Sequence, residues 1–313
     1  MNITIRSLDE SDVAAADTIF RQAFSSFLGI PDPRTFTGDA AIVATRWRAD
    51  ADAAHGAYAD GSLVGSSFAA CRGSFGFIGP VTVRPDLWGQ RVAQQLMSEA
   101  IGLLERRGVR QMALFTFPQS PKHIALYQKF GFWPQYLTPV MSKQVIPAGK
   151  QTMLSRYSAL PPAERSACLG QCAGLTERIF SGLDVRPEID AIAAQRLGET
   201  ILIHDAAGLA GFACCHIGAG TEAGTGATFV KFAAVRPGPD APALFERLLD
   251  DCEALAADAG CRELVAGINA ARHQAYRQMI NRGFRTFLEG VAMLRPNVPA
   301  FNRPDCFVID DLR

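Results

Sequence analysis

Apolar residues recur along the chain at two spacings, one typical of strands and one typical of helices. Residues 3–5 alternate between apolar and polar side chains, which predicts a strand near the amino terminus. Asp9 or Ser11 is then placed to cap a helix. That helix carries its apolar side chains at helical spacing: Val13, Ile19, Phe20, Phe24 and Phe27. The run 62–84 predicts two further strands that meet around Gly73.

A helix and a strand follow this pair of strands. The helix is predicted over residues 89–107, because its apolar residues fall on one stripe: Val92, Leu96, Ala100, Leu103 and Leu104. Residues 111–117 are short and apolar, as a buried strand is. A shorter helix closed by Gly131-Phe132 completes a strand, helix, strand, helix unit.

The same unit occurs a second time. A shift of 152 places aligns Val83-Arg84-Pro85 with Val235-Arg236-Pro237, and Gly131-Phe132 with Gly283-Phe284, without a gap; nine of these fifty aligned positions are identical. The second copy predicts a helix through 168–179 and strands at 153–157, 201–204, 209–217, 228–235 and 263–268. We therefore expect two domains, 1–148 and 149–313, joined by a linker at 147–150.

Composition narrows the class of protein. Among the 313 residues, 31 Lys and Arg balance 31 Asp and Glu, so charge gives no reason to expect nucleic acid or an anionic membrane as partner. No apolar run reaches the roughly 20 residues of a membrane-spanning helix. The start of the chain is acidic, unlike an export signal. We expect a cytoplasmic protein whose eight cysteines, which include no C-x-x-C pair, are free thiols that hold no metal.

The start of the predicted 89–107 helix resembles a motif of the GNAT superfamily of N-acetyltransferases. In that family a strand ending in V-x-P leads through a turn, [QR]-x-x-G-x-[GA], into a helix. In this chain Val83-Arg84-Pro85 is followed by Trp88, Gly89, Gln90, Arg91, Val92 and Ala93. Ala93 conforms to the family pattern, whereas Trp88 replaces Gln or Arg and Arg91 replaces Gly.

A second stretch resembles the family's other signature, Asn-x-x-Ala-x-x-Leu-Tyr-x-x-x-Gly-Phe. Residues 120–132 keep Leu126, Tyr127 and Gly131-Phe132, with Ser120 in place of Asn and His123 in place of Ala. The resemblance implies an α/β fold of two tandem GNAT-like domains, each a central mixed sheet flanked by helices. It also implies an acyltransferase that moves an acetyl group from acetyl-CoA to an amine, and for this chain we expect a small-molecule acceptor and a monomer.

The resemblance assigns roles to residues of the first copy. The pantetheine arm of acetyl-CoA is expected along Val81, Thr82 and Val83. The turn from Trp88 to Ala93 is expected to hold the pyrophosphate through main-chain N–H groups at a helix start, with Ser120 as a further coenzyme contact. Arg91 either obstructs this approach or adds a charge. Tyr127 occupies the place of the family's acid, which donates a proton to the departing thiolate.

The general base is open at this stage, because residues 63–84 and 106–163 contain no Asp or Glu. His123 lies one turn before Tyr127 on the same helix face and has a suitable ordinary pKa. An ordered water, a carboxylate such as Asp32 or Asp39, or a group from the second copy are the alternatives.

The second copy departs further from the family. Its turn, 240–245, contains Pro242, which lacks an N–H donor, and Asp240, which repels phosphate. Met279 stands where Tyr127 stands in the first copy, and Tyr276 lies one turn earlier. We expect a degenerate domain that completes the fold. The competing hypothesis for the whole chain is a non-catalytic acyl-CoA-binding or scaffold protein.

Overall fold

A single mixed sheet with helices on both faces forms the protein. The computed structural model describes residues 2–146 and 153–313, so the expected linker at 147–150 and the domain boundary at 148/149 lie outside the described residues. Within these described residues, thirteen strands form the sheet. This confirms the expected α/β class with a mixed sheet. No helix in the described part of the chain has the length and hydropathy needed to cross a membrane.

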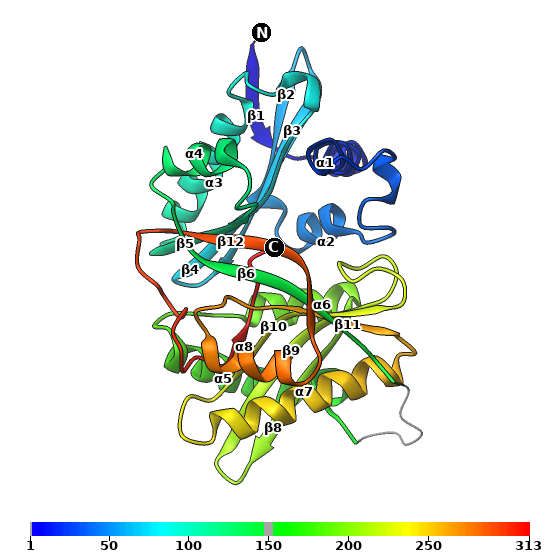
Figure 1. Cartoon of the computed structure of the whole chain (residues 1–313), viewed down its shortest axis with the longest axis vertical. Helices are drawn as coiled ribbons and strands as arrows, with labels where there is room; N and C mark the ends of the chain where they lie inside the picture. Colours follow the sequence, from blue (N-terminus) through cyan, green and yellow to red (C-terminus); the bar gives the residue numbers. More distant parts are fainter. Residues whose placement is uncertain (1, 147–152) are drawn as a thin grey trace.

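The first half builds one end of the molecule, drawn from blue to green in Figure 1. Its strands and helices are, in chain order, β1 (Ile3–Ser7), α1 (Val13–Leu28), α2 (Ile42–Ala49), β2 (Ala54–Ala59), β3 (Ser62–Arg72), β4 (Phe75–Val83), α3 (Val92–Arg106), β5 (Gln111–Thr116), α4 (Pro121–Gln128) and β6 (Trp133–Gln144).

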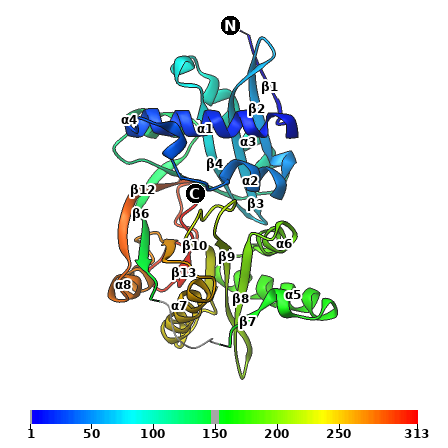
Figure 2. The same ribbon diagram turned by 90° about the vertical axis from the view of Figure 1, so that its right-hand side faces the viewer.

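The second half builds the other end. Its elements are β7 (Ser155–Arg156), α5 (Pro162–Ile179), α6 (Arg186–Gln195), β8 (Gly198–Asp205), β9 (Gly208–Ile217), β10 (Ala227–Val235), α7 (Ala241–Asp258), β11 (Glu263–Gly267), α8 (His273–Asn281), β12 (Arg285–Arg295) and β13 (Val308–Ile309). Figure 2 shows α1 and α2 on one face of the sheet, with α5 and α6 on the corresponding side of the second half.

Some predicted boundaries were wrong for local reasons. Neither Asp9 nor Ser11 caps α1: a 3-10 turn precedes the helix, its N-cap is Asp12, and Asp9 instead pairs with Arg6. Helix α3 begins at Val92 and not at residue 89, because Gly89 and Arg91 have left-handed backbones with φ of +84° and +65°. The strand expected at 153–157 shrinks to the two residues of β7.

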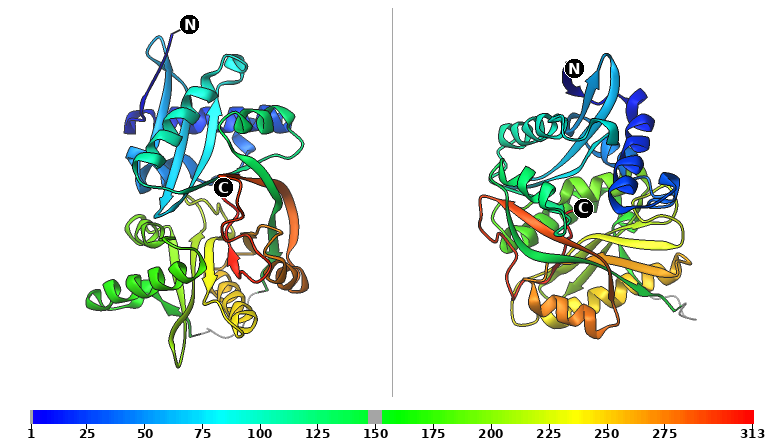
Figure 3. Two further views of the ribbon diagram at one scale, coloured as in Figure 1. Left: turned by 90° about the vertical axis from the view of Figure 1, so that its left-hand side faces the viewer. Right: turned by 45° about the horizontal axis from the view of Figure 1, so that its top comes forward.

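The two halves exchange one strand each within the sheet. The sheet runs β1-β2-β3-β4-β5-β12-β6-β11-β10-β9-β8-β7, so β12 of the second half lies between β5 and β6 of the first. Strand β6 in turn separates β12 from β11. Figures 1 and 3 show β6 and β12 crossing side by side between the two ends of the molecule.

The register of these strands repeats at the spacing found in the sequence. Met112 of β5 pairs with Arg295 of β12, and Leu264 of β11 pairs with Lys143 of β6. Each residue of the second pair corresponds to one of the first by a shift of 152. Thr138 and Gly290, which correspond to each other, pair directly and so lie on an approximate two-fold axis.

Apolar packing also crosses between the halves. Phe75 and Phe77 of β4 are buried in one cluster with Leu175 of α5 and Ile189 of α6. Leu294 of β12 belongs to the same cluster. The two halves therefore share this cluster.

A chain of buried ion pairs runs through the junction. Basic and acidic side chains alternate along it, with N–O distances of 2.9, 2.7, 3.1, 3.5 and 2.9 Å. In order the residues are Arg46, Glu222, Lys231, Glu188, Arg72 and Asp310. Arg46 and Arg72 belong to the first half and the other four residues to the second. The pairs at both ends, Arg46–Glu222 and Arg72–Asp310, therefore cross the junction between the halves. Alternation of sign leaves every charge with an opposite neighbour, which is the condition under which buried charges are tolerated.

We predict that Glu222→Gln lowers the free energy of unfolding at pH 7 by about 3–5 kcal/mol, because it leaves Arg46 and Lys231 short of a buried partner. Burial raises the pKa of Glu222, but Arg46 and Lys231 outweigh burial and hold this pKa below its ordinary value of 4.5. A group with a lowered folded-state pKa stabilises the protein above its unfolded-state pKa and loses that contribution below it. The difference in the free energy of unfolding between wild type and variant should therefore decrease below pH 4.5.

Denaturant titrations at pH 7 and at several lower pH values measure this effect. Glu99→Gln, on the exposed face of α3, is the matched control and should change the free energy of unfolding by less than about 0.5 kcal/mol. Equal stabilities of the two variants at pH 7 would show that the buried ion pairs do not hold the halves together.

Candidate functional site

The two central strands of the first half separate part-way along their length. Their parallel ladder runs from Phe75↔Gln111 to Phe77↔Ala113, yet β4 continues to Val83 and β5 to Thr116. We call the region beyond this ladder, residues 78–83 and 114–116, the β4–β5 wedge. Residues 79–81 of β4 are half-exposed there, whereas most of the strand is buried. The main chain of β4 on this side is therefore open to a ligand.

The other edge of β4 is firmly held. Val81, Thr82 and Val83 pair with Ser67, Ser66 and Gly65 of β3. The Thr82 hydroxyl also lies 3.2 Å from the Ser66 hydroxyl. The three residues expected to line the coenzyme thus pair with β3 on one side, and in the described part of the chain they have no strand partner on the other.

The turn before α3 brings most of its expected residues to the surface. Gln90 and Arg91 are exposed, and a Cβ at Gly89 would meet nothing within 4 Å. Arg91 is the N-cap of α3 and adopts the left-handed backbone that costs a non-glycine residue about 1–2 kcal/mol. Because the first N–H groups of a helix have no partner within it, this turn is an open anion-binding end.

Three residues of the turn contact other parts of the first half. Trp88 is 47% exposed, but its Nε1–H donates to the carbonyl oxygen of Val83 at 2.8 Å and so ties the turn to the end of β4. The side chains of Val92 and Ala93 pack with Leu96 in an apolar cluster. Val92 is buried there and Ala93 is half-buried.

Tyr127 lies on α4, beside the end of β5. Burial raises the pKa of Tyr127 to about 12, and a side-chain hydrogen bond with Thr116 acts in the opposite direction. Thr116 is the last residue of β5 and borders the wedge. The phenol is therefore protonated across the neutral range and lies next to the open part of the sheet.

Ser120 and His123 open the same helix. Ser120 is its N-cap, and the Ser120 hydroxyl oxygen accepts a hydrogen bond from the main-chain N–H of His123 at 3.4 Å. The His123 ring packs against Phe27 of α1 with 4.7 Å between ring centroids. Burial lowers the pKa of His123, so the imidazole is neutral at pH 7.

The two carboxylates considered as bases are engaged elsewhere. Asp32 accepts hydrogen bonds from Arg34, which lower its pKa. Asp39 accepts hydrogen bonds from the Thr225 hydroxyl and main-chain N–H, which lower its pKa likewise. Asp39 thereby fastens α1 and α2 to the loop between β9 and β10. Its position is structural.

Comparison with known proteins agrees with this geometry. Residues 16–132 match the model of the acetyltransferase (GNAT) family. The matched region begins in α1 and ends at Phe132, so it includes the wedge, the turn and α4. It supports acyl transfer as the general activity, and no curated protein sequence matches the chain.

Solved structures resemble the chain over nearly its whole length. A putative acetyltransferase from Pyrococcus horikoshii has a TM-score of 0.70 at 16% identity, covering 98% of this chain and 94% of that one. A GCN5-related N-acetyltransferase from Sphaerobacter thermophilus has a TM-score of 0.59 at 16% identity, covering 94% and 95%. At this identity the likeness concerns the fold, which extends over both halves.

The second half carries different residues at the corresponding positions. Helix α7 begins at Ala241 with Pro242 in its first turn, and the Pro242 carbonyl accepts a hydrogen bond from Gln278. Met279, at the position of Tyr127, is completely buried. Tyr276 is partly buried against the same core.

We predict that the His123 imidazole titrates with a midpoint below 6.5, because Phe27 and its neighbours shield it from water. Phe27→Ala exposes the ring and should move the midpoint up toward 6.5. Proton NMR of the imidazole resonances measures both midpoints, with His123→Gln identifying the signal. An unchanged midpoint in Phe27→Ala would contradict the packing explanation.

Proposed function

We propose that the protein transfers an acetyl group from acetyl-CoA to an amine of a small-molecule acceptor, with the coenzyme in the β4–β5 wedge. The observation that carries this proposal is the meeting of the open edge of β4 with Tyr127 at the end of β5. A pantetheine arm offers amide groups that can pair with an unpaired strand edge. The main-chain groups of Val81 and the N–H of Val83 supply that edge, because Thr82 faces β3 and the Val83 carbonyl already accepts from Trp88.

The phosphate end of the coenzyme then reaches the turn. The unpartnered N–H groups at the start of α3 and the positive end of its dipole suit a pyrophosphate. Arg91 already has the left-handed backbone that glycine would adopt there, and its side chain is exposed. We therefore assign Arg91 an added positive charge toward the phosphates and not an obstruction.

The reaction itself needs one proton to leave the amine and one to reach the sulfur. The C–N bond forms as the C–S bond breaks, and the amine becomes acidic as the amide forms. Tyr127, whose raised pKa keeps it protonated, donates to the departing thiolate. His123, neutral at pH 7 because its pKa is lowered, accepts the proton from the amine.

The two halves of the chain correspond to each other in sequence and in strand register. We infer that 1–148 and 149–313 are duplicated domains, of which the first is catalytic. The matched registers at a spacing of 152 residues support the duplication. The pairing of β6 with β12 supplies within one chain the contact that two copies would otherwise make, so we propose a monomer.

One observation favours a second candidate, a protein that binds acyl-CoA without turnover. Asp32 and Asp39 are both occupied by hydrogen bonds, so neither offers a free carboxylate base. Loss of the Tyr127 hydroxyl separates the candidates, because only the transferase needs it.

We predict that Tyr127→Phe lowers kcat about 10²- to 10³-fold and leaves coenzyme affinity unchanged, because only a proton donor is removed. Tyr276→Phe, on the corresponding helix of the second half, is the matched control and should keep full activity. Thiol release from acetyl-CoA over a panel of amines measures turnover. Equal rates for both variants and wild type would exclude the acid role of Tyr127.

We further predict that Ala93→Glu abolishes coenzyme binding, because it places a carboxylate against the proposed phosphate site. Ala243→Glu, at an exposed position in the first turn of α7 in the second half, should bind coenzyme as the wild type does. Calorimetric titration with acetyl-CoA gives affinity and stoichiometry for each. Binding that survives in Ala93→Glu and is lost in Ala243→Glu would move the site to the second half.

A further inference from the structure

The second half contains a wedge of the same kind, and residues 307–312 fill it. The β10–β11 ladder starts at Ala227↔Glu263, which corresponds by the 152-residue shift to the start of the β4–β5 ladder at Phe75↔Gln111. Strand β13 lies along the end of β10, with Ile309 paired to Ala233 and Val308 to Ala234. On its other side, Asp310 forms a parallel bridge with Ile268, just after β11.

The strand residues that hold this segment are those that correspond to the proposed coenzyme contacts. Ala233, Ala234 and Val235 are the counterparts of Val81, Thr82 and Val83. Val235 donates its N–H to the Phe307 carbonyl at 3.3 Å. Every residue of β10 is buried, whereas part of β4 is half-exposed at the open wedge.

The counterpart of Ser120 also binds this segment. Arg272 is the N-cap of α8, as Ser120 is of α4. The buried Arg272 guanidinium donates to the main-chain carbonyls of Val308 at 3.1 Å and Asp310 at 3.0 Å. In the second half, the side chain at the position that corresponds to Ser120 thus binds the chain's own backbone.

Side chains complete the fit. Phe307 packs against Phe245 with 5.6 Å between ring centroids. The Asp311 carboxylate lies over Gly267 so closely that a Cβ there would collide with it. Asp310 continues across the junction to Arg72 of β3, at 2.9 Å. The segment therefore fills its wedge from β10 to β11 and is anchored to the first half.

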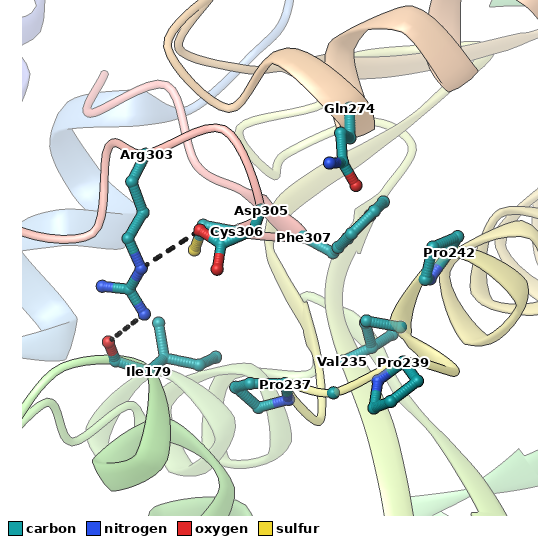
Figure 4. Close-up of a pocket in the computed structure, with 12 residues that line it drawn as sticks. Ile179, Val235, Pro237, Pro239, Pro242, Gln274, Arg303, Asp305, Cys306 and Phe307 are labelled. Carbon is teal, nitrogen blue, oxygen red and sulfur yellow. Dashed lines mark hydrogen bonds and ion pairs between the residues drawn. The ribbon is translucent and has the colours of Figure 1, made fainter.

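What is left at the phosphate end is small. A cavity of about 260 Å³ remains between the turn before α7 and residues 303–307. Figure 4 shows Pro237, Pro239 and Pro242 on one side of it and Phe307 on the other, with Arg303 bound to Asp305 and to the Ile179 carbonyl. The one nearby guanidinium is therefore already paired within the chain.

We propose that residues 307–312 are a built-in occupant of the second wedge, which takes the place of a pantetheine arm and excludes coenzyme from this half. The identity of the displaced ligand rests on the proposed function, whereas the occupation itself does not. Two consequences follow: the chain binds one coenzyme, and the second half stays closed when the first is loaded.

Hydrogen exchange of the unmodified chain, followed by mass spectrometry with and without coenzyme A, tests the proposal. Amides of 307–312 should exchange about a hundredfold or more slowly than exposed loops, and coenzyme A should leave them unchanged while slowing exchange in 81–93. Rapid exchange of 307–312, or loss of their protection on adding coenzyme A, would overturn the proposal. Protected 307–312 with no effect in 81–93 would instead count against the proposed function alone.

Two variants sharpen the test. Arg272→Lys keeps a charge but loses the fork that holds both carbonyls, so exchange at 308–310 should rise about tenfold or more while β10 stays protected. Ala93→Glu should bind no coenzyme A at all. A remaining coenzyme A site in Ala93→Glu that releases 307–312 would show that the second wedge is an open binding site.

Discussion

The pairing of β6 with β12 determines the rest of the structure. Because β12 lies between β5 and β6, the sheet of each half is completed by a strand of the other, and the two halves become one continuous layer. Apolar residues of β4 then share a cluster with α5 and α6, and charged residues at the junction are removed from water. The alternation from Arg46 to Asp310 satisfies those charges in turn. A separated half would expose all three features.

The two wedges share a strand register but differ in what lies between their strands. In both, parallel strands part after a short ladder and a helix starts at the far end. The first retains an open strand edge, a turn of exposed residues and a protonated phenol. The second has Pro242 in its turn, Met279 in place of the phenol and its own backbone between the strands. The segment that lies between the strands, and not the register of the strands, decides which wedge is available to a ligand.

Much of the fold could be predicted from sequence, because local patterns determine it. Neighbouring residues alone determine the helices that carry apolar stripes and the strands from 62 to 83. The repeat at 152 residues follows from comparing the sequence with itself. The turn and Tyr127 came from the family resemblance, and the family match covers both. Short helices such as α2 and α6 were missed, because eight to ten residues show little periodicity.

The features that escaped prediction depend on residues distant in sequence. Strand β6 contains two prolines and exposed apolar residues, and this pattern does not indicate β12 as its partner. The hydrogen bond from Trp88 to Val83 and the place of Asp39 against Thr225 likewise need the folded chain. The same holds for residues 307–312, whose two strand residues are too few to form a pattern.

The position of β12 has a consequence for the order of folding. Strand β5 cannot gain its second neighbour until residues 285–295 have been synthesised, long after α4 and β6 have left the ribosome. Contacts so distant in sequence are slow to form. Until then the nascent first half carries an exposed strand edge, which is a template for pairing with other chains. The first half therefore reaches its final form only as β12 of the second half is completed.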